Sequence, residues 1–437
     1  MFLLFSLTES VVLLEDYLVL TSRDIKLYEL EMFIVSASND ITKTSFSANF
    51  ETSSRMLELG VLRVKLTTEA AEELRLNVNV IAVEKDHIIS AHKSTTAIIG
   101  NKIVQFAAPW NLDRIDQSSL PLDTFYTSFS DKQGDNVDVY VLDSGVKAQH
   151  TDFESRVDLS LSRSFYQTIS SDVDDENGHG TFVSSLAIGK TFGVAKQARL
   201  VALKIYGKDN SGPVSSAIQA VDYILPLIQS RARASPPRRS VVNLSWGGDK
   251  SLIVDNAVKR LVDAGAVVVV AAGNDRGSDA CNFSPSGASE AICVGAIDPV
   301  GDRFATYSNA GSCIDLLAPG TLTVGASKDS IDGSIQMSGT SMSSPLVAGA
   351  AAVYLSTFKD ASPAKVKRGL SCSSPAKGKG VPGETTTKIL NIPSGGFETS
   401  NDKCSQDSGF GKFDSLNKKF YESFVLCMTV LLIVFVY

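Results

Sequence analysis

SGTSMSSP at residues 338–345, followed by the small residues Val347–Ala352, is the stretch that decides the fold of this chain. Small neighbours allow Ser341 to lie at a helix N-terminus, where free backbone N–H groups and the helix dipole stabilise a developing oxyanion. Proline costs little in the first turn of a helix, and an alanine- and glycine-rich helix can pack closely in a core. Ser341 is therefore a candidate nucleophile.

A second motif, NGHGTFV at residues 177–183, places His179 between two glycines at the start of an apolar stretch that can form a helix. The chain has only 4 histidines. The flanking glycines leave the imidazole accessible to a substrate and to two partners, as a general base requires. Taken alone, the motif is equally compatible with a loop histidine or a metal ligand.

Apolar, β-branched runs alternate with helical stretches from about Pro109 onward. Continuous apolar strands are typical of a parallel sheet covered on both faces, and helices between them imply right-handed crossovers. The expected strands are 137–142, 200–205, 241–244, 267–272 and 292–294, with a helix at 216–228. We therefore expect an α/β fold with a mostly parallel sheet.

Polar residues follow two of these runs. Asp143 ends the run 137–142, and Gly273 and Asn274 follow the run 267–272. Functional residues in such sheets lie beyond the carboxyl ends of the strands. Asn274 could donate a side-chain hydrogen bond to an oxyanion, although either residue on its own is more typical of a turn.

Composition excludes several classes of protein. The 437 residues are 43% apolar and 20% charged, which indicates a globular chain. A net charge of −7 gives no basic surface for nucleic acid. The 6 cysteines are too few for a disulfide-built scaffold, and none has CxxC spacing.

The sequence predicts four segments. Residues 1–30 are apolar but lack an early basic residue, so they are either a leader or a buried element. Residues 31–106 read as a small α+β unit with strands at 32–35 and 78–83 and a helix at 67–76. The large α/β unit follows at 107–396, and 397–437 forms a tail.

The tail ends in an uncharged stretch, Phe424–Tyr437. A helix of this length reaches only about 21 Å, which is short of the ~30 Å hydrocarbon core. A lipid-anchor signal, a short membrane anchor and an interfacial tail all remain compatible with it.

Together the motifs resemble the subtilisin superfamily, most closely its proteinase K branch, over about residues 32–360. The order Asp143, His179, Ser341 is that of the subtilisin triad. The resemblance implies a secreted or membrane-anchored serine endopeptidase with a three-layer α/β fold and no cofactor for catalysis. Ser341 is then the nucleophile, His179 the base, Asp143 its orienting carboxylate and Asn274 the oxyanion donor.

The same resemblance assigns further residues. Two segments resemble those that bind an extended peptide as an added strand, and their residues are Ser211, Gly212, Ser245, Trp246, Gly247 and Gly248. Residues 31–106 resemble an inhibitory propeptide that binds its own catalytic domain, with cleavage shortly before Ala108. The resemblance also implies a Cys281–Cys313 disulfide and a structural Ca²⁺ held by Asp315 with the carbonyls of Ser289 and Ala291.

Three positions depart from the family pattern, namely Phe182, Ser184 and Ser185, which replace histidine, alanine and glycine. None of the three carries the chemistry, so they bear on the rate more than on the mechanism. A catalytically inactive relative that acts as a binding protein is the alternative hypothesis. A structural cell-surface protein is a third hypothesis, supported only by residues 424–437.

Overall fold

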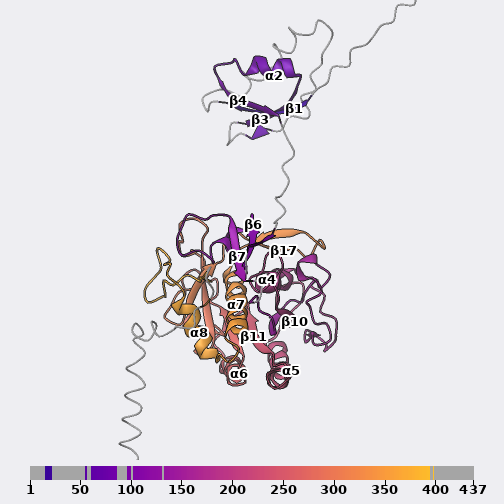
Figure 1. Ribbon diagram of the computed structural model, residues 1–437, viewed down its shortest axis with the longest axis vertical. Helices are drawn as coiled ribbons and strands as arrows, with labels where there is room; N and C mark the ends of the chain where they lie inside the picture. Colours follow the sequence, from indigo (N-terminus) through magenta and orange to yellow (C-terminus); the bar gives the residue numbers. More distant parts are fainter. Residues whose placement is uncertain are drawn as a thin grey trace, which may run out of the picture. The chain divides into compact units, whose positions relative to one another are not determined.

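The computed structural model describes residues 15–21, 55–56, 61–85, 96–99, 102–129, 132–393 and 397. The chain divides into two units, residues 1–92 and 93–437. The larger unit contains the predicted sheet and all the candidate active-site residues (Figure 1).

Seven parallel strands form the central sheet of the larger unit, in the order β16-β15-β13-β11-β8-β10-β9. Their bounds are β8 (Val137–Asp143), β9 (Arg163–Ser164), β10 (Arg199–Lys204), β11 (Arg239–Leu244), β13 (Val267–Ala271), β15 (Ile292–Ile297) and β16 (Leu316–Pro319). The first strand in sequence, β8, lies between β10 and β11, so the chain crosses over it. The predicted parallel sheet is confirmed.

Helices cover both faces of this sheet, which explains why its strands are apolar throughout. Val139 and Val141 of β8 join one core with α4 (His179–Ile188), α7 (Thr340–Thr357) and α8 (Pro363–Cys372). Tyr140 and Leu142 join the other core with α5 (Val214–Ala232) and α6 (Leu252–Asp263). The result is the expected three-layer α/β architecture.

Smaller elements surround the sheet. They are the antiparallel pair β17 (Thr323–Ala326) and β18 (Ser334–Met337), the pair β12 (Gly248–Asp249) and β14 (Phe283–Ser284), and the short helices α3 (Trp110–Asp113), η3 (Thr151–Phe153) and η4 (Ala280–Asn282). A three-stranded antiparallel sheet contains β5 (Thr96–Ile99), β6 (Lys102–Phe106) and β7 (Phe125–Phe129).

The boundary between the units differs from the one expected at residue 106. Strands β5 and β6 pair with β7 and therefore belong to the larger unit. Gln105 is buried, and its Nε2 donates to the carbonyl of Thr191 at 2.9 Å. This contact spans 86 residues, so a local sequence pattern could not show it.

The smaller unit is a four-stranded sheet with one helix. The sheet order is β2-β3-β1-β4, with β1 (Glu15–Thr21), β2 (Arg55–Met56), β3 (Val61–Leu66) and β4 (Val80–Lys85). Helix α2 (Thr68–Leu74) begins where predicted, because the Thr67 side chain caps it by accepting from Ala70 N at 3.2 Å. Its apolar core includes Tyr17 and Leu74, both nearly fully buried.

The leader expected at residues 1–30 differs from the structure in part. Residues 15–21 form β1, which pairs antiparallel with both β3 and β4. The charged residues Glu15 and Asp16 are the first residues of this strand. The strand expected at Met32–Val35 lies outside the described residues.

Within the described part of the chain, no helix combines the length and hydropathy needed to cross a membrane. The apolar stretch Phe424–Tyr437 lies outside that part.

A carboxylate cluster lies next to α3. Asp113 is 2% exposed and accepts from Thr124 N at 2.8 Å, while Asp116 accepts from Thr127 N at 2.7 Å. Asp116 Oδ1 is buried and has no hydrogen-bond partner among the described residues. Burial, reinforced by nearby Asp123, raises the pKa of Asp113 to about 6 and that of Asp116 to about 7.

We expect Asp116→Asn to stabilise the protein at pH 8 in a buffer containing a metal chelator. A folded-state pKa above the unfolded value means that the native state binds more protons, so this carboxyl lowers stability as the pH rises from about 4 to about 7. After screening of a partly exposed group, the gain is roughly 1–2 kcal/mol, or a few degrees in Tm. Thermal melts at pH 4 and pH 8 measure it. Asp222→Asn, an exposed aspartate on α5, is the control, and an equal gain at both pH values would contradict the assignment.

Candidate active site

The carboxyl end of β8 positions the first functional side chain. All seven residues of β8 are buried, so Asp143 is held rigidly at the strand end with 1% exposure. Asp143 Oδ1 lies 2.8 Å from His179 Nδ1 and also accepts from Ser144 N at 2.8 Å. The carboxylate therefore orients the imidazole through Nδ1. The second ring nitrogen, Nε2, is left to act as the base.

Helix α4 begins at His179. Its N-cap is Gly178, whose φ of +107° favours glycine. A Cβ on Gly180 would come within 2.2 Å of the carbonyl oxygen of Gly145, so glycine is also required there. These two requirements explain why glycines flank the histidine.

A second buried carboxylate, Asp175, organises the start of α4. It is 3% exposed and accepts from the backbone N–H groups of Gly178 and Thr181, both at 2.8 Å. It also accepts from Ser144 Oγ at 2.7 Å, which joins α4 to the turn after β8. The sequence analysis missed Asp175. Its position four residues before His179, ahead of a helix, was the available signal.

The electrostatics favour a basic imidazole. Burial opposes charging of His179, but the charge and hydrogen bond of Asp143, together with Asp175, raise its pKa above the ordinary value. The side chain of His179 keeps 12% exposure. His150, the other histidine in the described part of the chain, has both ring nitrogens engaged, with Asp152 N and with the Gly333 carbonyl.

Ser341 is the second residue of α7, close to the helix N-terminus as predicted. Its Oγ donates to the carbonyl of Ser245 at 3.0 Å, and Ser245 Oγ donates back to the carbonyl of Ser341 at 2.9 Å. Because Ser245 follows β11 directly, this pair of bonds fixes the start of α7 at the end of that strand.

Pro345 is the sixth residue of α7 and not in its first turn, as the sequence analysis expected. A proline has no N–H, so it cannot bond the carbonyl four residues earlier, which belongs to Ser341. That carbonyl accepts from Ser245 Oγ instead. The proline thus frees the acceptor that anchors the candidate nucleophile.

The three candidate catalytic residues are held at the carboxyl ends of two neighbouring strands. Asp143 ends β8 and holds His179, while Ser245 follows β11 and holds Ser341. Strands β8 and β11 are hydrogen-bonded neighbours and parallel, so their carboxyl ends lie roughly 5 Å apart. Helices α4 and α7 also pack against each other (Figure 1).

Two hydrogen-bond donors converge beside Ser341. Asn274 Oδ1 accepts from Thr340 N at 2.9 Å and from Thr340 Oγ1 at 3.1 Å. These two bonds fix the orientation of the amide and leave Nδ2 as a donor to another group. A Cβ placed on Gly339 would lie 3.4 Å from Asn274 Nδ2 and 3.8 Å from Ser341 N. The space that glycine leaves open is therefore shared by both donors, as an oxyanion site requires.

Asn309 holds the turn that carries Asn274, and the sequence analysis missed it. It is buried, its Nδ2 donates to the Ala272 carbonyl at 3.1 Å, and its Oδ1 accepts from Asp275 N at 2.7 Å. Gly273 has φ +100°, and a Cβ there would lie 2.4 Å from Asn309 Nδ2. Only a tight glycine turn accommodates this contact.

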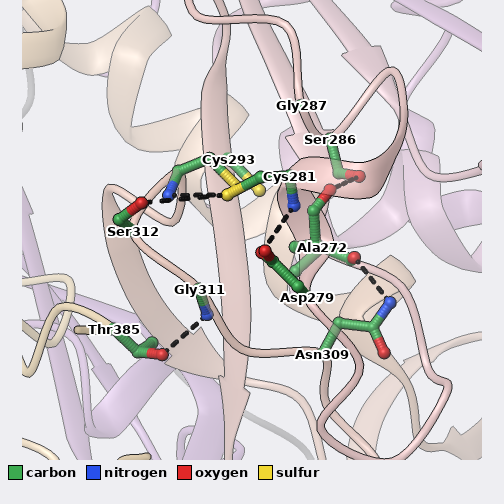
Figure 2. Close-up of a disulfide and its surroundings, with 12 residues drawn as sticks. Ala272, Asp279, Cys281, Ser286, Gly287, Cys293, Asn309, Gly311, Ser312 and Thr385 are labelled. Carbon is green, nitrogen blue, oxygen red and sulfur yellow. Dashed lines mark hydrogen bonds between the residues drawn. A yellow bond between two sulfur atoms is a disulfide. The ribbon is translucent and has the colours of Figure 1, made fainter. Parts of the chain in front are cut away.

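The disulfide Cys281–Cys313 encloses the segment that includes Asn309, with a Cα–Cα distance of 5.6 Å. Figure 2 shows the bond together with Asp279, which accepts from Cys281 N at 3.0 Å. Of the residues that the structure describes, only Asp279, Cys281 and Cys313 bring three potential metal ligands together. The sulfurs of Cys281 and Cys313 are joined in the disulfide, so we assign no metal there.

The predicted substrate-binding segments follow the two strands that flank β8. Ser211 and Gly212 follow β10 and are exposed; a Cβ on Gly212 would lie 2.4 Å from the Ile205 carbonyl oxygen. Ser245 follows β11, but its side chain is buried and bonded to α7, so only its backbone is available for a ligand.

The rest of that segment is more open. Trp246 is half-buried, while Gly247 and Gly248 are exposed. Gly248 pairs with Ser284 in the short β12–β14 ladder.

The three departures from the family pattern lie inside α4. Phe182 is fully buried, and Gly325 of β17 gives it space, since a Cβ on Gly325 would lie 3.0 Å from its ring. Ser185 Oγ donates to the Phe182 carbonyl and accepts from Ala326 N at 2.9 Å, which ties α4 to β17. Ser184 Oγ is buried without a hydrogen-bond partner in the described residues. None of the three contacts the triad side chains through a hydrogen bond described in the structure.

The set of oxygens expected to bind Ca²⁺ is taken by a side chain. The Lys367 ammonium lies 2.9 Å from Asp315 Oδ2 and donates to the carbonyls of Ser289 at 3.0 Å and Ala291 at 2.7 Å. These are the three groups that the resemblance assigned to the metal. As arranged here, they bind a lysine.

Known proteins resemble the chain over this same region. The family model described as the subtilase family matches residues 134–402. The sexual differentiation process putative subtilase-type proteinase isp6 of Schizosaccharomyces pombe is 38% identical over 69% of this chain and 61% of its own length. The alkaline serine exoprotease A of Vibrio alginolyticus is 38% identical over 69% of this chain and 53% of its own.

An extracellular serine proteinase of a Thermus species is 37% identical over 70% of this chain and 69% of its own length. Among solved structures, a cold-adapted subtilisin-like serine proteinase matches with a TM-score of 0.57 and 35% identity, covering 65% of this chain and 98% of that one. The chain spans 61% and 53% of the lengths of the isp6 and Vibrio relatives, less than two thirds in each case.

Proposed function

The chain belongs to the subtilase family, and from this we propose that it is a serine endopeptidase acting through Ser341, His179 and Asp143. The observation that carries the proposal is the bond between His179 Nδ1 and Asp143 Oδ1 at 2.8 Å. It is supported by the two candidate oxyanion donors, Asn274 Nδ2 and Ser341 N, which both lie near the space left open at Gly339. We propose further that the chain belongs to the proteinase K branch, which its sequence motifs resemble.

In the proposed mechanism, Ser341 Oγ leaves the Ser245 carbonyl, rotates toward His179 Nε2 and attacks the scissile carbonyl carbon. His179 takes the hydroxyl proton, and Asp143 stabilises the imidazolium that results. Asn274 Nδ2 and Ser341 N bind the negative oxygen of the tetrahedral intermediate. The imidazolium then protonates the leaving amine. In the second half, His179 takes a proton from water as the water attacks the acyl-enzyme carbonyl, and the imidazolium returns a proton to Ser341 Oγ as the acid product leaves.

The substrate would be a peptide in extended conformation. The segments after β10 and β11 flank the end of β8, which gives two backbone edges on either side of the triad. Main-chain hydrogen bonds to such edges bind a peptide regardless of its side chains. The residues at 245–248 and 271–274 are mostly small and neutral, which favours apolar or aromatic side chains before the cut.

We also propose that the enzyme is made as a zymogen. The smaller unit, residues 1–92, is a separate α+β unit of the kind that could act as an inhibitory propeptide. Secretion is favoured by the Cys281–Cys313 disulfide, because such bonds persist in oxidising compartments, and by the extracellular Thermus relative. A membrane tether through residues 424–437 stays a proposal for the tail.

Labelling with phenylmethylsulfonyl fluoride tests the function directly. We expect a single covalent adduct on Ser341, found by mass spectrometry of peptides, together with loss of peptide hydrolysis. A well-folded protein that neither hydrolyses peptides nor reacts at Ser341 would instead support the alternative, a catalytically inactive binding protein.

Replacing the side-chain oxyanion donor gives a quantitative test. We expect Asn274→Ala to lower kcat by about 10²–10³-fold with little change in KM, because the lost hydrogen bond forms mainly in the transition state. Steady-state kinetics on a chromogenic peptide measure both constants. Arg276→Ala, an exposed change two residues away, is the control. A loss confined to KM would argue against the oxyanion role.

A further inference from the structure

Lys367 projects from α8 into a set of three oxygens. Asp315 Oδ2, the Ser289 carbonyl and the Ala291 carbonyl all lie within 3.0 Å of its ammonium nitrogen. An ammonium group has three N–H donors and no acceptor. The site therefore satisfies every donor of the lysine.

The carboxylate of this site depends on a cation. Asp315 has a side-chain exposure of 20% and joins β15 to the start of β16, since its Oδ2 accepts from Cys293 N and its own N–H donates to the Cys293 carbonyl, both at 2.9 Å. Burial raises the pKa of Asp315, and Lys367 is the largest of the influences that oppose this, followed by Cys293 N–H and Lys388. A buried carboxylate left without a partner is costly.

The geometry suits a lysine better than a calcium ion. Ca²⁺ takes six to eight oxygens at about 2.3–2.6 Å. Here three protein oxygens surround the nitrogen at 2.7–3.0 Å, which is ordinary hydrogen-bond length. A calcium ion at the same point would have to displace the ammonium and would meet its positive charge nearby.

We propose that Lys367 acts as a built-in cation at this site, so that the Asp315–Ser289–Ala291 oxygens bind no Ca²⁺ in this protein. The site is then occupied as soon as α8 packs against the sheet, without dependence on the metal concentration outside the cell. Removing the ammonium while keeping the carboxylate would create a vacant cation site. The inference does not depend on the catalytic proposal, because Lys367 has no described contact with the triad.

The test is a calcium titration of thermal stability in the full-length protein. Lys367→Met removes the charge and keeps the length of the side chain. We expect its Tm to fall in EDTA and to rise by about 3 °C in 10 mM CaCl₂, beyond any response of the wild type. Lys365→Met is the matched control, since Lys365 is exposed on the same helix and faces the Phe358 ring. We expect its calcium response to equal that of the wild type.

The double variant Lys367→Met, Asp315→Asn should lose the added calcium response, because the carboxylate is gone. If Lys367→Met responds to calcium no more than the wild type does, the proposal is overturned. Hydrogen exchange on the wild type gives a second measurement that needs no variant. We expect calcium to leave exchange in residues 289–293 and 313–317 unchanged, and added protection there would equally overturn the proposal.

Discussion

Ser341→Ala is expected to abolish peptide hydrolysis, with kcat falling by about 10⁶-fold to the level provided by binding and the oxyanion site alone. Ser341 is fixed at the start of α7 by its reciprocal bonds with Ser245, and alanine leaves no nucleophile at this position. If the smaller unit is an inhibitory propeptide removed by self-processing, the variant should also accumulate as the full-length chain. Peptide assays and gel analysis of the expressed protein measure the two effects.

The fold of the variant must be shown to be intact for this result to count. Ser341→Ala removes one oxygen from a partly exposed side chain, so the variant should still give a cooperative thermal melt. Ser278→Ala provides the control, as a serine-to-alanine change outside the site. Hydrolysis that persists at more than one thousandth of the wild-type rate in Ser341→Ala would rule out Ser341 as the nucleophile.

Asp143→Asn is expected to lower kcat by about 10⁴-fold. An amide in this position can donate to His179 Nδ1, which places the imidazole proton on Nε2, where it cannot accept the proton of Ser341. The change is nearly isosteric at a site that is 1% exposed, so the sheet should remain folded. Steady-state kinetics measure the loss.

The pH profile separates this catalytic role from a structural one. Activity requires a neutral His179, so the wild-type rate falls as the pH drops through a His179 pKa that Asp143 holds above the ordinary value. Without the negative charge that pKa falls, and the acid limb of kcat/KM moves to lower pH. Asp172→Asn, an exposed aspartate, should leave both rate and profile unchanged. An acid limb that does not move in Asp143→Asn would count against the assignment.

Several features could be read from the chain without its structure. Apolar runs without polar alternation fixed the parallel sheet, because only strands covered on both faces tolerate that composition. The glycines around His179 and the small residues around Ser341 pointed to the site, because their steric roles are local. Gly178 needs a positive φ, and Gly339 must leave room for two donors.

Other features depend on contacts between residues far apart in sequence. Asp175 and Asn309 position the site through hydrogen bonds that the pattern of apolar residues does not predict. Strand β6 belongs to the larger unit because it pairs with β7 and Gln105 reaches Thr191. The carbonyl of Ser341 is available to Ser245 only because Pro345 lies deeper in α7 than the motif suggested.

The oxygens around Asp315 show most clearly the difference between what the sequence predicts and what the tertiary structure decides. The resemblance of the sequence to a family implied that an aspartate and two carbonyls would come together around a cation. Only the tertiary structure decided which cation they hold, because Lys367 comes from a helix more than fifty residues away in the chain. Local patterns specify backbone geometry and residue type, whereas the partner of a buried charge is chosen by packing.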